Sequence, residues 1–270
     1  MSKQAVVVQA GALLLLGGSL WALPSRAAQP RVVEVPAGPA FVRLPGASEI
    51  NARSGQSLKT NALLRTAKPG RMQVMLGNGR QFRMGGDAQL RLGASDVELL
   101  RGSLIGWIKP GTPRLNPFTI KTRLATASIQ GTTVFLEFTD EEFKVFSWEG
   151  TVQVETSNGR RFTLNSGQQL LLDLKQQMDE VSVRVDGLEA SLAELGGGIV
   201  TPPTPGRDGS RSPRSRDKEQ PDFKWEPPQA VSAEDAERRL QKSLLINGFS
   251  TPLETLPDIE RELGVSAPTP

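Results

Sequence analysis

The sequence predicts an all-β protein that ends in a small helical segment. From about residue 64 to residue 174, short stretches of alternating apolar and polar residues follow one another, separated by Gly, Asn, Asp or Pro. Strands at such regular steps, with turn residues between them, are typical of sandwiches, barrels and solenoids. No helical period of useful length interrupts the series. We therefore expect a short-stranded β-solenoid or β-sandwich-like domain.

The expected strands share this alternation and are bounded by turn residues. They are residues 72–76, 81–84, 88–92, 97–100, 104–108, 118–120, 125–129, 133–138, 143–148, 151–155, 162–164 and 169–172.

Residues 125–138, ATASIQGTTVFLEF, predict a hairpin of two strands joined at Gly131. Asn-Gly pairs at residues 78–79 and 158–159 predict two-residue hairpin turns, because both central positions of such turns need a positive φ. The segments around these two pairs, VMLGNGRQFRMGG and VQVETSNGRRFTLNSG, are similar. They indicate two related hairpins in a degenerate repeat.

Residues 1–28 predict a signal peptide. Lys3 precedes an apolar run from Ala5 to Leu23, and small residues follow, with cleavage expected after Ala27 or Ala28. The alternative is a retained anchor, because the run is just long enough to span a bilayer. We expect an exported protein of the periplasm or cell surface of a bacterium, in contact with the membrane only if this segment is not cleaved.

The amino-acid composition excludes several kinds of covalent bond, catalytic group and metal site. The chain has no Cys and no His. Disulfides, thiolate nucleophiles, histidine bases and His or Cys metal sites are therefore excluded. The densest acidic cluster, residues 140–142, lies between two expected strands, where a solvated turn is the simplest interpretation. We predict no catalytic, cofactor-binding or metal-binding residue and no enzymatic activity.

The remaining chain divides by composition. Residues 29–57 are a lead-in, residues 58–178 the β domain, and residues 179–198 an extension with strand and helix patterns. Residues 199–230 are rich in Pro and Arg and predict a disordered linker. Residues 231–265 predict two short amphipathic helices, one capped at Ser232 and one that starts at Pro257. Such helices are too short for a core of their own and are expected to dock on the β domain or on a partner.

Four residues of this C-terminal part are candidates for partner binding. Phe223 and Trp225 form an isolated aromatic pair in a polar linker, which suggests a short docking motif. Leu240 and Leu244 lie on one stripe of the first expected helix.

Charge separates the β region from the tail. Residues 41–178 contain 18 Lys and Arg against 11 Asp and Glu, whereas residues 219–270 contain 5 against 10. A basic domain can be attracted to an anionic cell-wall polymer, although salt screens such attraction beyond about 10 Å. We expect an envelope protein as the partner and no nucleic acid.

The order of segments resembles the FecR domain. The resemblance covers roughly residues 58–175 and is carried by LKTNALLRTAKPGRMQVMLGNGRQFRMGGDAQLRL, LLRGSLIGWI, PFTIKTRLATASIQGTTVFLEF, FKVFSWEGTVQV and TLNSGQQL. In the family the third block is approximately Thr-Pro-x-Ala-Thr-x-Gly-Val-Arg-Gly-Thr-x-Phe. Thr122, Ala125, Thr126, Gly131 and Thr132 keep this pattern, whereas Arg123, Ser128, Gln130 and Val134 depart from it.

Thr126, Gly131, Thr132 and Gly150 are expected to have structural roles. Gly131 and Gly150 occupy positions where the chain reverses and where a positive φ or close contact is needed. The threonines favour strands and can hydrogen-bond across the turn.

The resemblance implies an extracytoplasmic module for envelope binding, sensing or scaffolding. Family members with a cytoplasmic segment relay a receptor signal to a sigma factor. Only Met1, Ser2, Lys3 and Gln4 precede the apolar run, so no such segment is expected here. Two alternatives stay open, namely a membrane-anchored FecR-like regulator of signal transduction and a cell-wall or polysaccharide-binding protein.

Overall fold

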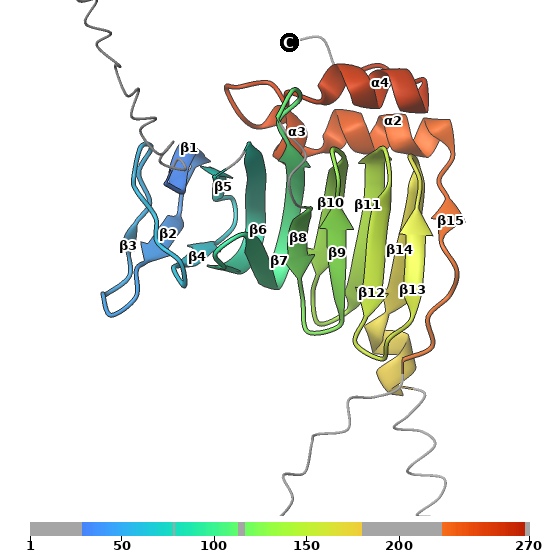
Figure 1. The fold of residues 1–270 in the computed structure, drawn as a ribbon, viewed down its shortest axis with the longest axis horizontal. Helices are drawn as coiled ribbons and strands as arrows, with labels where there is room; N and C mark the ends of the chain where they lie inside the picture. The colour runs from blue at the N-terminus through green and yellow to red at the C-terminus, as the bar shows by residue number, and fades with distance from the viewer. Residues whose placement is uncertain (1–28, 78, 113–116, 180–222, 268–270) are drawn as a thin grey trace, which may run out of the picture.

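The structure is a computed structural model that describes residues 29–77, 79–112, 117–179 and 223–267. Within these residues the strands form one 15-stranded sheet that branches and does not close. All strand pairs are antiparallel except β7 with β8. Strands β1 to β3 lie at one end of the long axis of the molecule and β13 to β15 at the other (Figure 1). The predicted all-β fold with C-terminal helices is confirmed.

The branching divides the sheet into two layers that share the long strands β6 and β7. Layer A contains β1 (Arg31–Ala37), β5 (Arg71–Met75), the first half of β6 (Arg80–Leu92), the second half of β7 (Asp96–Ile108), β10 (Thr133–Phe138), β11 (Glu142–Glu149), β14 (Gln168–Asp173) and β15 (Gln229–Ala230). Layer B contains β2 (Ala40–Arg43), β3 (Ile50–Asn51), β4 (Leu63–Thr66), the second half of β6, the first half of β7, β8 (Phe118–Lys121), β9 (Ala125–Ile129), β12 (Val152–Thr156) and β13 (Arg161–Leu164).

The strands β6 and β7 pass from one layer to the other at an irregularity in their pairing. The register between them shifts between Gly85 and Gln89. Gly102 lies opposite this shift with a φ of +93°, and a Cβ at Gly102 would lie 2.4 Å from the Cα of Ala88. Because only glycine tolerates both the φ and the contact, Gly102 lets the two strands cross between layers. Each of these strands was expected from the sequence as two shorter ones.

The inner faces of both layers enclose a single apolar core. Alternate residues along the strands point inward, as the period of a pleated strand requires. Fully buried side chains of this core include Met72, Phe82, Leu90, Phe118 and Phe143.

Residues 125–138 do not form the predicted hairpin. The strands β9 and β10 have the predicted bounds, but β9 pairs with β8 and β12 in layer B, whereas β10 pairs with β7 and β11 in layer A. The turn at Gly131 is therefore an arch between layers. Arch and hairpin need the same turn residues and the same alternation, so the sequence does not separate them.

The two repeated hairpins are present, as β5 with β6 and β12 with β13. The turn at residues 158–159 is longer than predicted, because Gly159 has a φ of +82° while Asn158 is not among the residues with positive φ. The amide of Gly159 donates to the carbonyl of Thr156 at 2.9 Å, and the amide of Thr156 donates to the carbonyl of Arg160 at 2.9 Å. Asn78 lies outside the described residues.

The ends of the domain extend beyond the predicted strands. Residues 29–57 contribute β1, β2 and β3 to the sheet. At the other end, residues 174–179 are helical, and the chain returns at residue 223. Residues 1–28 and 180–222, which include the predicted signal peptide and most of the predicted linker, lie outside the described part. No helix within the described residues combines the length and the apolar character needed to cross a bilayer.

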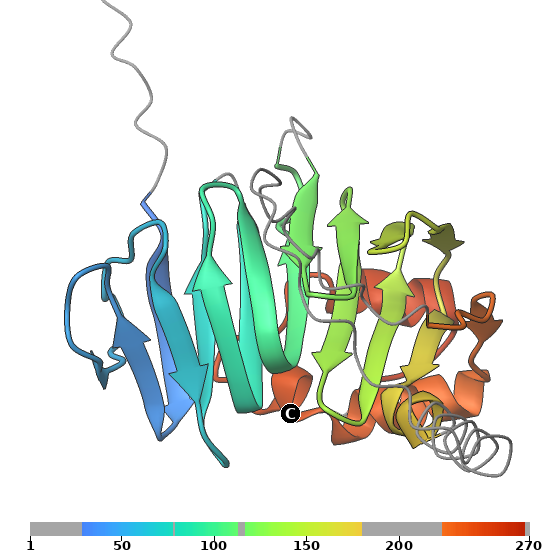
Figure 2. The same cartoon turned by 90° about the horizontal axis from the view of Figure 1, so that it is seen from below.

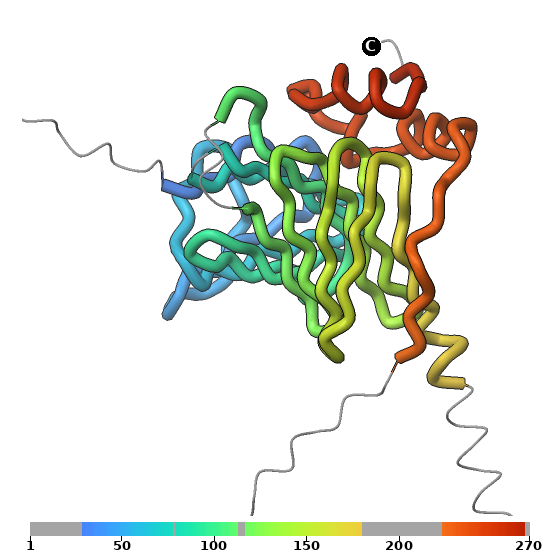
Figure 3. Tube along the Cα trace, turned by 45° about the vertical axis from the view of Figure 1, so that its right-hand side comes forward, coloured from blue at the N-terminus to red at the C-terminus, as the bar shows by residue number. Residues whose placement is uncertain are grey.

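Three helices follow β15, namely α2 (Ala233–Lys242), α3 (Leu244–Asn247) and α4 (Leu256–Leu263). Ser232 caps α2 as predicted, since its side chain accepts from the amide of Asp235 at 3.1 Å. The predicted first helix is interrupted at Ser243, whose ψ of 108° is extended. The helices lie on the same side of the strands (Figure 2). The segment that leads to them runs beside the last strands (Figure 3).

Candidate interaction site

The C-terminal segment, residues 231–267, covers part of the outer face of layer A, and we call this segment the clasp. A second apolar cluster lies between the clasp and the sheet. The sheet contributes Ile105, Trp107, Phe146 and Trp148, and the clasp contributes Ala236, Leu240, Leu245, Ile246, Leu253, Ile259 and Val265. The domain thus provides a receptor surface, which its own C-terminal segment occupies.

Arg83 is the polar centre of this surface. Its side chain points outward from β6 and is fully buried by the clasp. The guanidinium donates to the carbonyls of Leu245 at 3.1 Å and Ile246 at 2.9 Å, and also to the carbonyl of Thr251. Carbonyls at the end of a short helix lack helical partners, so a buried cation satisfies them. Burial lowers the pKa of Arg83 to about 10, while the charges of Glu34 and Glu254 act to raise it.

A chain of polar contacts extends from Arg83 along layer A. Its Nε donates to Gln73 at 2.9 Å, and Gln73 donates to Gln81 at 3.0 Å. Gln81 donates to the carboxylate of Glu254 at 2.8 Å, which also accepts from the indole of Trp107 at 3.1 Å. These strand side chains recognise the turn that joins α3 to α4.

The edge strand β1 contributes a further contact to the same turn. One carboxylate oxygen of Glu34 accepts from the amide of Ser250 at 2.8 Å, and the other accepts from the hydroxyl of Thr251 at 3.3 Å. Burial acts to raise the pKa of Glu34, but these hydrogen bonds lower it overall. The ionised carboxylate is therefore the form that holds this turn.

Glu149 lies at the other end of the clasp, under α4. Its side chain accepts from the hydroxyl of Thr133 at 2.9 Å, and that hydroxyl lies 2.6 Å from the hydroxyl of Thr255. All three residues are buried. Burial raises the pKa of Glu149 to about 7, and the nearby Asp258 and Glu262 add to the rise, while the Thr133 hydrogen bond and Arg261 oppose it.

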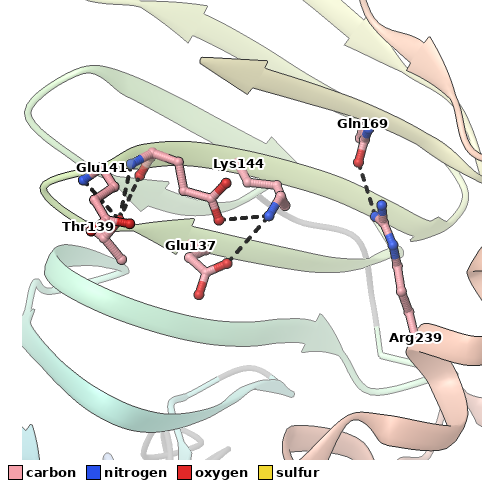
Figure 4. Close-up of polar contacts among 7 residues, drawn as sticks. Glu137, Thr139, Glu141, Lys144, Gln169 and Arg239 are labelled. Carbon is pink, nitrogen blue, oxygen red and sulfur yellow. Dashed lines mark hydrogen bonds and ion pairs between the residues drawn. The ribbon is translucent and has the colours of Figure 1, made fainter. Parts of the chain in front are cut away.

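A charged cluster occupies layer A beside the clasp. Lys144 pairs with Glu142 at 2.7 Å and with Glu137 at 3.6 Å. Figure 4 shows Lys144 directed toward Glu137, and it shows the contact of 3.0 Å between Arg239 of α2 and Gln169 of β14. Burial raises the pKa of Glu137, and the neighbouring carboxyl of Glu142 raises it further, whereas Lys144 lowers it.

Asp140 and Glu141 form the predicted turn, and Glu142 begins β11. The hydroxyl of Thr139 accepts from the amides of Glu141 at 3.2 Å and Glu142 at 3.1 Å, as Figure 4 shows for Glu141. Among the described residues no group of three or more acidic side chains is arranged to hold a metal ion.

The structure divides the four candidate partner-binding residues. Trp225 is 4% exposed and contacts the core residue Phe143 edge-to-face, with ring centroids 5.4 Å apart. Phe223 is half-buried against the same core. Leu240 is buried in the clasp, whereas Leu244 is 61% exposed because the helix breaks before it. Three of the four therefore pack against the chain's own domain.

The four residues with expected structural roles lie at the arches and on layer B. Gly131 and Gly150 have φ values of +76° and +66°. A Cβ at Gly150 would lie 2.4 Å from the Cγ2 of Thr132, so the two arches are in contact. Thr126 lies in the middle of layer B, opposite Lys121 and Glu155.

Sequence reasoning did not single out Arg83 or Glu149. Both are charged residues at the strand positions that point away from the apolar core. Alternation alone therefore assigns them to solvent. The tight packing of the C-terminal helices on the sheet converts these positions to buried ones.

Comparison with known proteins identifies the central part of the chain. Residues 62–153 match the family model described as FecR protein. This segment is a FecR domain. The resemblance expected from the sequence motifs is thereby confirmed, and the match spans β4 to β12 of the two layers.

Two crystal structures of a candidate anti-sigma factor from Parabacteroides distasonis ATCC 8503 are similar to the chain. One, at 1.65 Å resolution, is 19% identical with a TM-score of 0.34 and covers 39% of this chain and 51% of its own. The other, at 2.50 Å, is 18% identical with a TM-score of 0.37 and covers 42% and 55%. The chain thus matches about half the length of these solved chains. No curated protein matches it significantly.

Proposed function

We propose that the chain is a non-enzymatic, extracytoplasmic FecR-domain protein that binds another envelope component as a sensing or scaffold module. The match of residues 62–153 to the FecR family carries this proposal. The pattern of residues 1–28, which is that of an export signal, supports an extracytoplasmic location.

We assign the partner to the outer face of layer B, because the clasp occupies part of the outer face of layer A. The outer residues of β12 and β13 in layer B are exposed and polar, namely Gln153, Glu155, Arg161 and Thr163. Among the described residues, none of the clasp packs in the apolar core that lies behind this face, between the two layers.

The edge strand β13 provides backbone groups for an extended partner segment. The amide of Thr156 donates to the carbonyl of Arg160, which makes this a hydrogen-bonded pair. In an antiparallel ladder the bonded pairs alternate, so the backbone groups of Arg161 and Thr163 point away from β12. Among the described strands only β12 pairs with β13. An extended segment of an envelope protein, added to this edge, would satisfy these groups.

Photo-cross-linking in intact bacteria tests this assignment. We place a photoreactive amino acid at Thr163 on the free edge and, as a control, at Arg53, which is exposed in the loop after β3. The proposal expects a discrete adduct with an envelope protein from position 163 and none from position 53. An exported chain that gives no adduct at position 163, or the same adducts at both positions, would contradict it.

A membrane-anchored regulator of signal transduction is the second candidate, and the FecR match favours it as well. The two functions differ in the fate of the N-terminal segment. N-terminal sequencing of the protein recovered from bacterial fractions separates them. A start at Ala28 or Gln29 supports the secreted module, whereas an intact N-terminus in the membrane fraction supports the anchored regulator.

A further inference from the structure

The two ends of the clasp are held by different chemistry. At one end, Arg83 binds main-chain carbonyls around α3, and this contact keeps its charge near neutral pH because the pKa of Arg83 is about 10. At the other end, α4 rests on the buried carboxyl of Glu149. Only the second contact involves a group that changes its charge near neutral pH.

The groups around Glu149 disfavour its negative charge. Asp258 and Glu262 of α4 bring two further carboxyls, and Arg261 brings the opposing positive charge. Arg261 is itself paired with Asp258 at 2.5 Å. Thr133 of β10 and Thr255 before α4 contribute only hydroxyls. An ionised Glu149 is thus buried beside like charges with one partly neutralised cation.

Glu262 fixes the far end of α4 on the same loops. Its carboxylate accepts from the amide of Gly150 at 2.7 Å and from the hydroxyl of Ser166. Leu263 packs on Gly167, where an added Cβ would lie 3.2 Å from its Cδ2. Because Gly150 follows Glu149 directly, these contacts place the carboxyl group of Glu262 close to Glu149.

The contact between the clasp and layer A also leaves buried polar atoms unsatisfied. Among the described residues, the buried side-chain atoms without a hydrogen-bond partner are the Nε1 of Trp148, the Nε of Arg71 and the Oγ1 of Thr132. Trp148 lies in the cluster under the clasp, Arg71 lies beside Gly248, and Thr132 contacts Gly150. Of these atoms, the Nε1 of Trp148 lies in the cluster under the clasp, so it costs free energy in the closed state that hydration would recover on opening.

We propose that α4 is a pH-dependent flap, which closes on layer A when Glu149 is protonated and is released when Glu149 ionises, while α3 stays anchored by Arg83 and α2 by Arg239. Release uncovers Trp148 and the adjoining arches at Gly131 and Gly150. This flap depends only on contacts within the chain, so the proposal does not depend on which envelope partner the domain binds.

The direction of the pH effect follows from proton linkage. The pKa of Glu149 is about 7 in the closed state, and an opened flap returns it toward the ordinary value of 4.5. The closed state therefore binds the proton more tightly, and its advantage is fully present below pH 4.5 and is lost as the pH rises to 7. The opening equilibrium should increase by up to roughly tenfold for each pH unit in this window.

Hydrogen exchange of the full chain tests the flap. Amide exchange is measured from pH 5 to pH 8, corrected for the intrinsic rate, in peptides from α4 and, as internal references, from α2 and β6. The proposal expects protection of α4 to fall by about tenfold or more between pH 5 and pH 7, with the references unchanged. A parallel loss of protection in β6 would show global destabilisation and overturn the proposal.

Two variants complete the test. Glu149→Gln keeps the shape and the acceptor but cannot ionise, so protection of α4 should no longer depend on pH. Glu141→Gln removes an exposed carboxylate in the turn before β11 and should keep the pH dependence of the natural chain. If Glu149→Gln retains the pH dependence, the proposal is wrong. If Glu149→Gln does not fold, the Thr133→Val variant takes its place. It removes a hydrogen bond that lowers the pKa of Glu149, so the opening should shift to higher pH, and an unshifted profile or a shift to lower pH overturns the proposal.

Discussion

The guanidinium of Arg83 on β6 donates a hydrogen bond of 2.9 Å to the main-chain carbonyl of Ile246 in α3. The two residues are far apart in the sequence, and they connect the FecR domain to its C-terminal clasp. The contact makes residues 231–267 part of the same folded unit as the two layers.

Replacing Arg83 with Met should weaken this connection strongly. The variant leaves the buried carbonyls of Leu245, Ile246 and Thr251 without their donor, so we expect a loss of about 2–4 kcal/mol in the free energy of unfolding. Arg91→Met is the matched control, because Arg91 is exposed and pairs only with Glu98, and its effect should stay below about 1 kcal/mol. Urea unfolding measures both, and equal effects would show that the buried contacts contribute little.

Gly150→Ala should destabilise the arches. The alanine would have to keep a φ of +66°, and its Cβ would lie 2.4 Å from the Cγ2 of Thr132. We therefore expect a loss of roughly 2–3 kcal/mol in the free energy of unfolding. Gly159→Ala is the control, since Gly159 has a similar φ of +82° but nothing within 4 Å, and it should lose only about 1 kcal/mol. Thr132→Ser, which removes the Cγ2, should recover part of the loss in the Gly150→Ala background. No difference between the two glycine variants would contradict the contact between the arches.

Trp225→Ala should behave as a core substitution. The indole is buried against Phe143 and Phe162, so its removal should lower the free energy of unfolding by about 3–5 kcal/mol. Phe223→Ala, at a half-buried neighbour, should have a smaller effect. A thermal unfolding curve of Trp225→Ala that matches the natural chain would instead favour the docking motif suggested by the sequence.

Replacing residues 181–221 with a short Gly-Ser linker should preserve the folded domain. The flanks already lie together, because the side chain of Gln177 donates to the carbonyl of Lys224 at 2.9 Å and accepts from its amide at 2.8 Å. Circular dichroism and the unfolding midpoint of the shortened chain should match those of the full chain, since no described contact is removed. A chain that loses its β-sheet signal would show that residues 181–221 are needed for folding.

Most strands could be predicted because alternation and turn residues are local signals. The bounds of β9 and β10 follow directly from ATASI and TVFLEF around Gly131. The short strands of residues 29–57 were missed because they contain few alternating residues, and their pairing with β4 and β5 comes from contacts distant in sequence.

The partition into layers and the position of the clasp are tertiary properties. Gly131 requires a turn in either case, but the partners β8 and β11 decide whether that turn closes a hairpin or an arch. Arg83 and Glu149 are ordinary polar positions in the sequence, and burial by the clasp gives each its shifted pKa.

The sequence by itself determined that the central residues are β strands with C-terminal helices, and its motifs identified the FecR domain. These features depend on the order of neighbouring residues, which fixes backbone preference and period. Only the tertiary structure decided that Trp225 completes the core and that Arg83 and Glu149 hold the C-terminal segment. Burial and electrostatic environment are produced by side chains that are distant along the chain, so they exist only once the layers and helices have packed together.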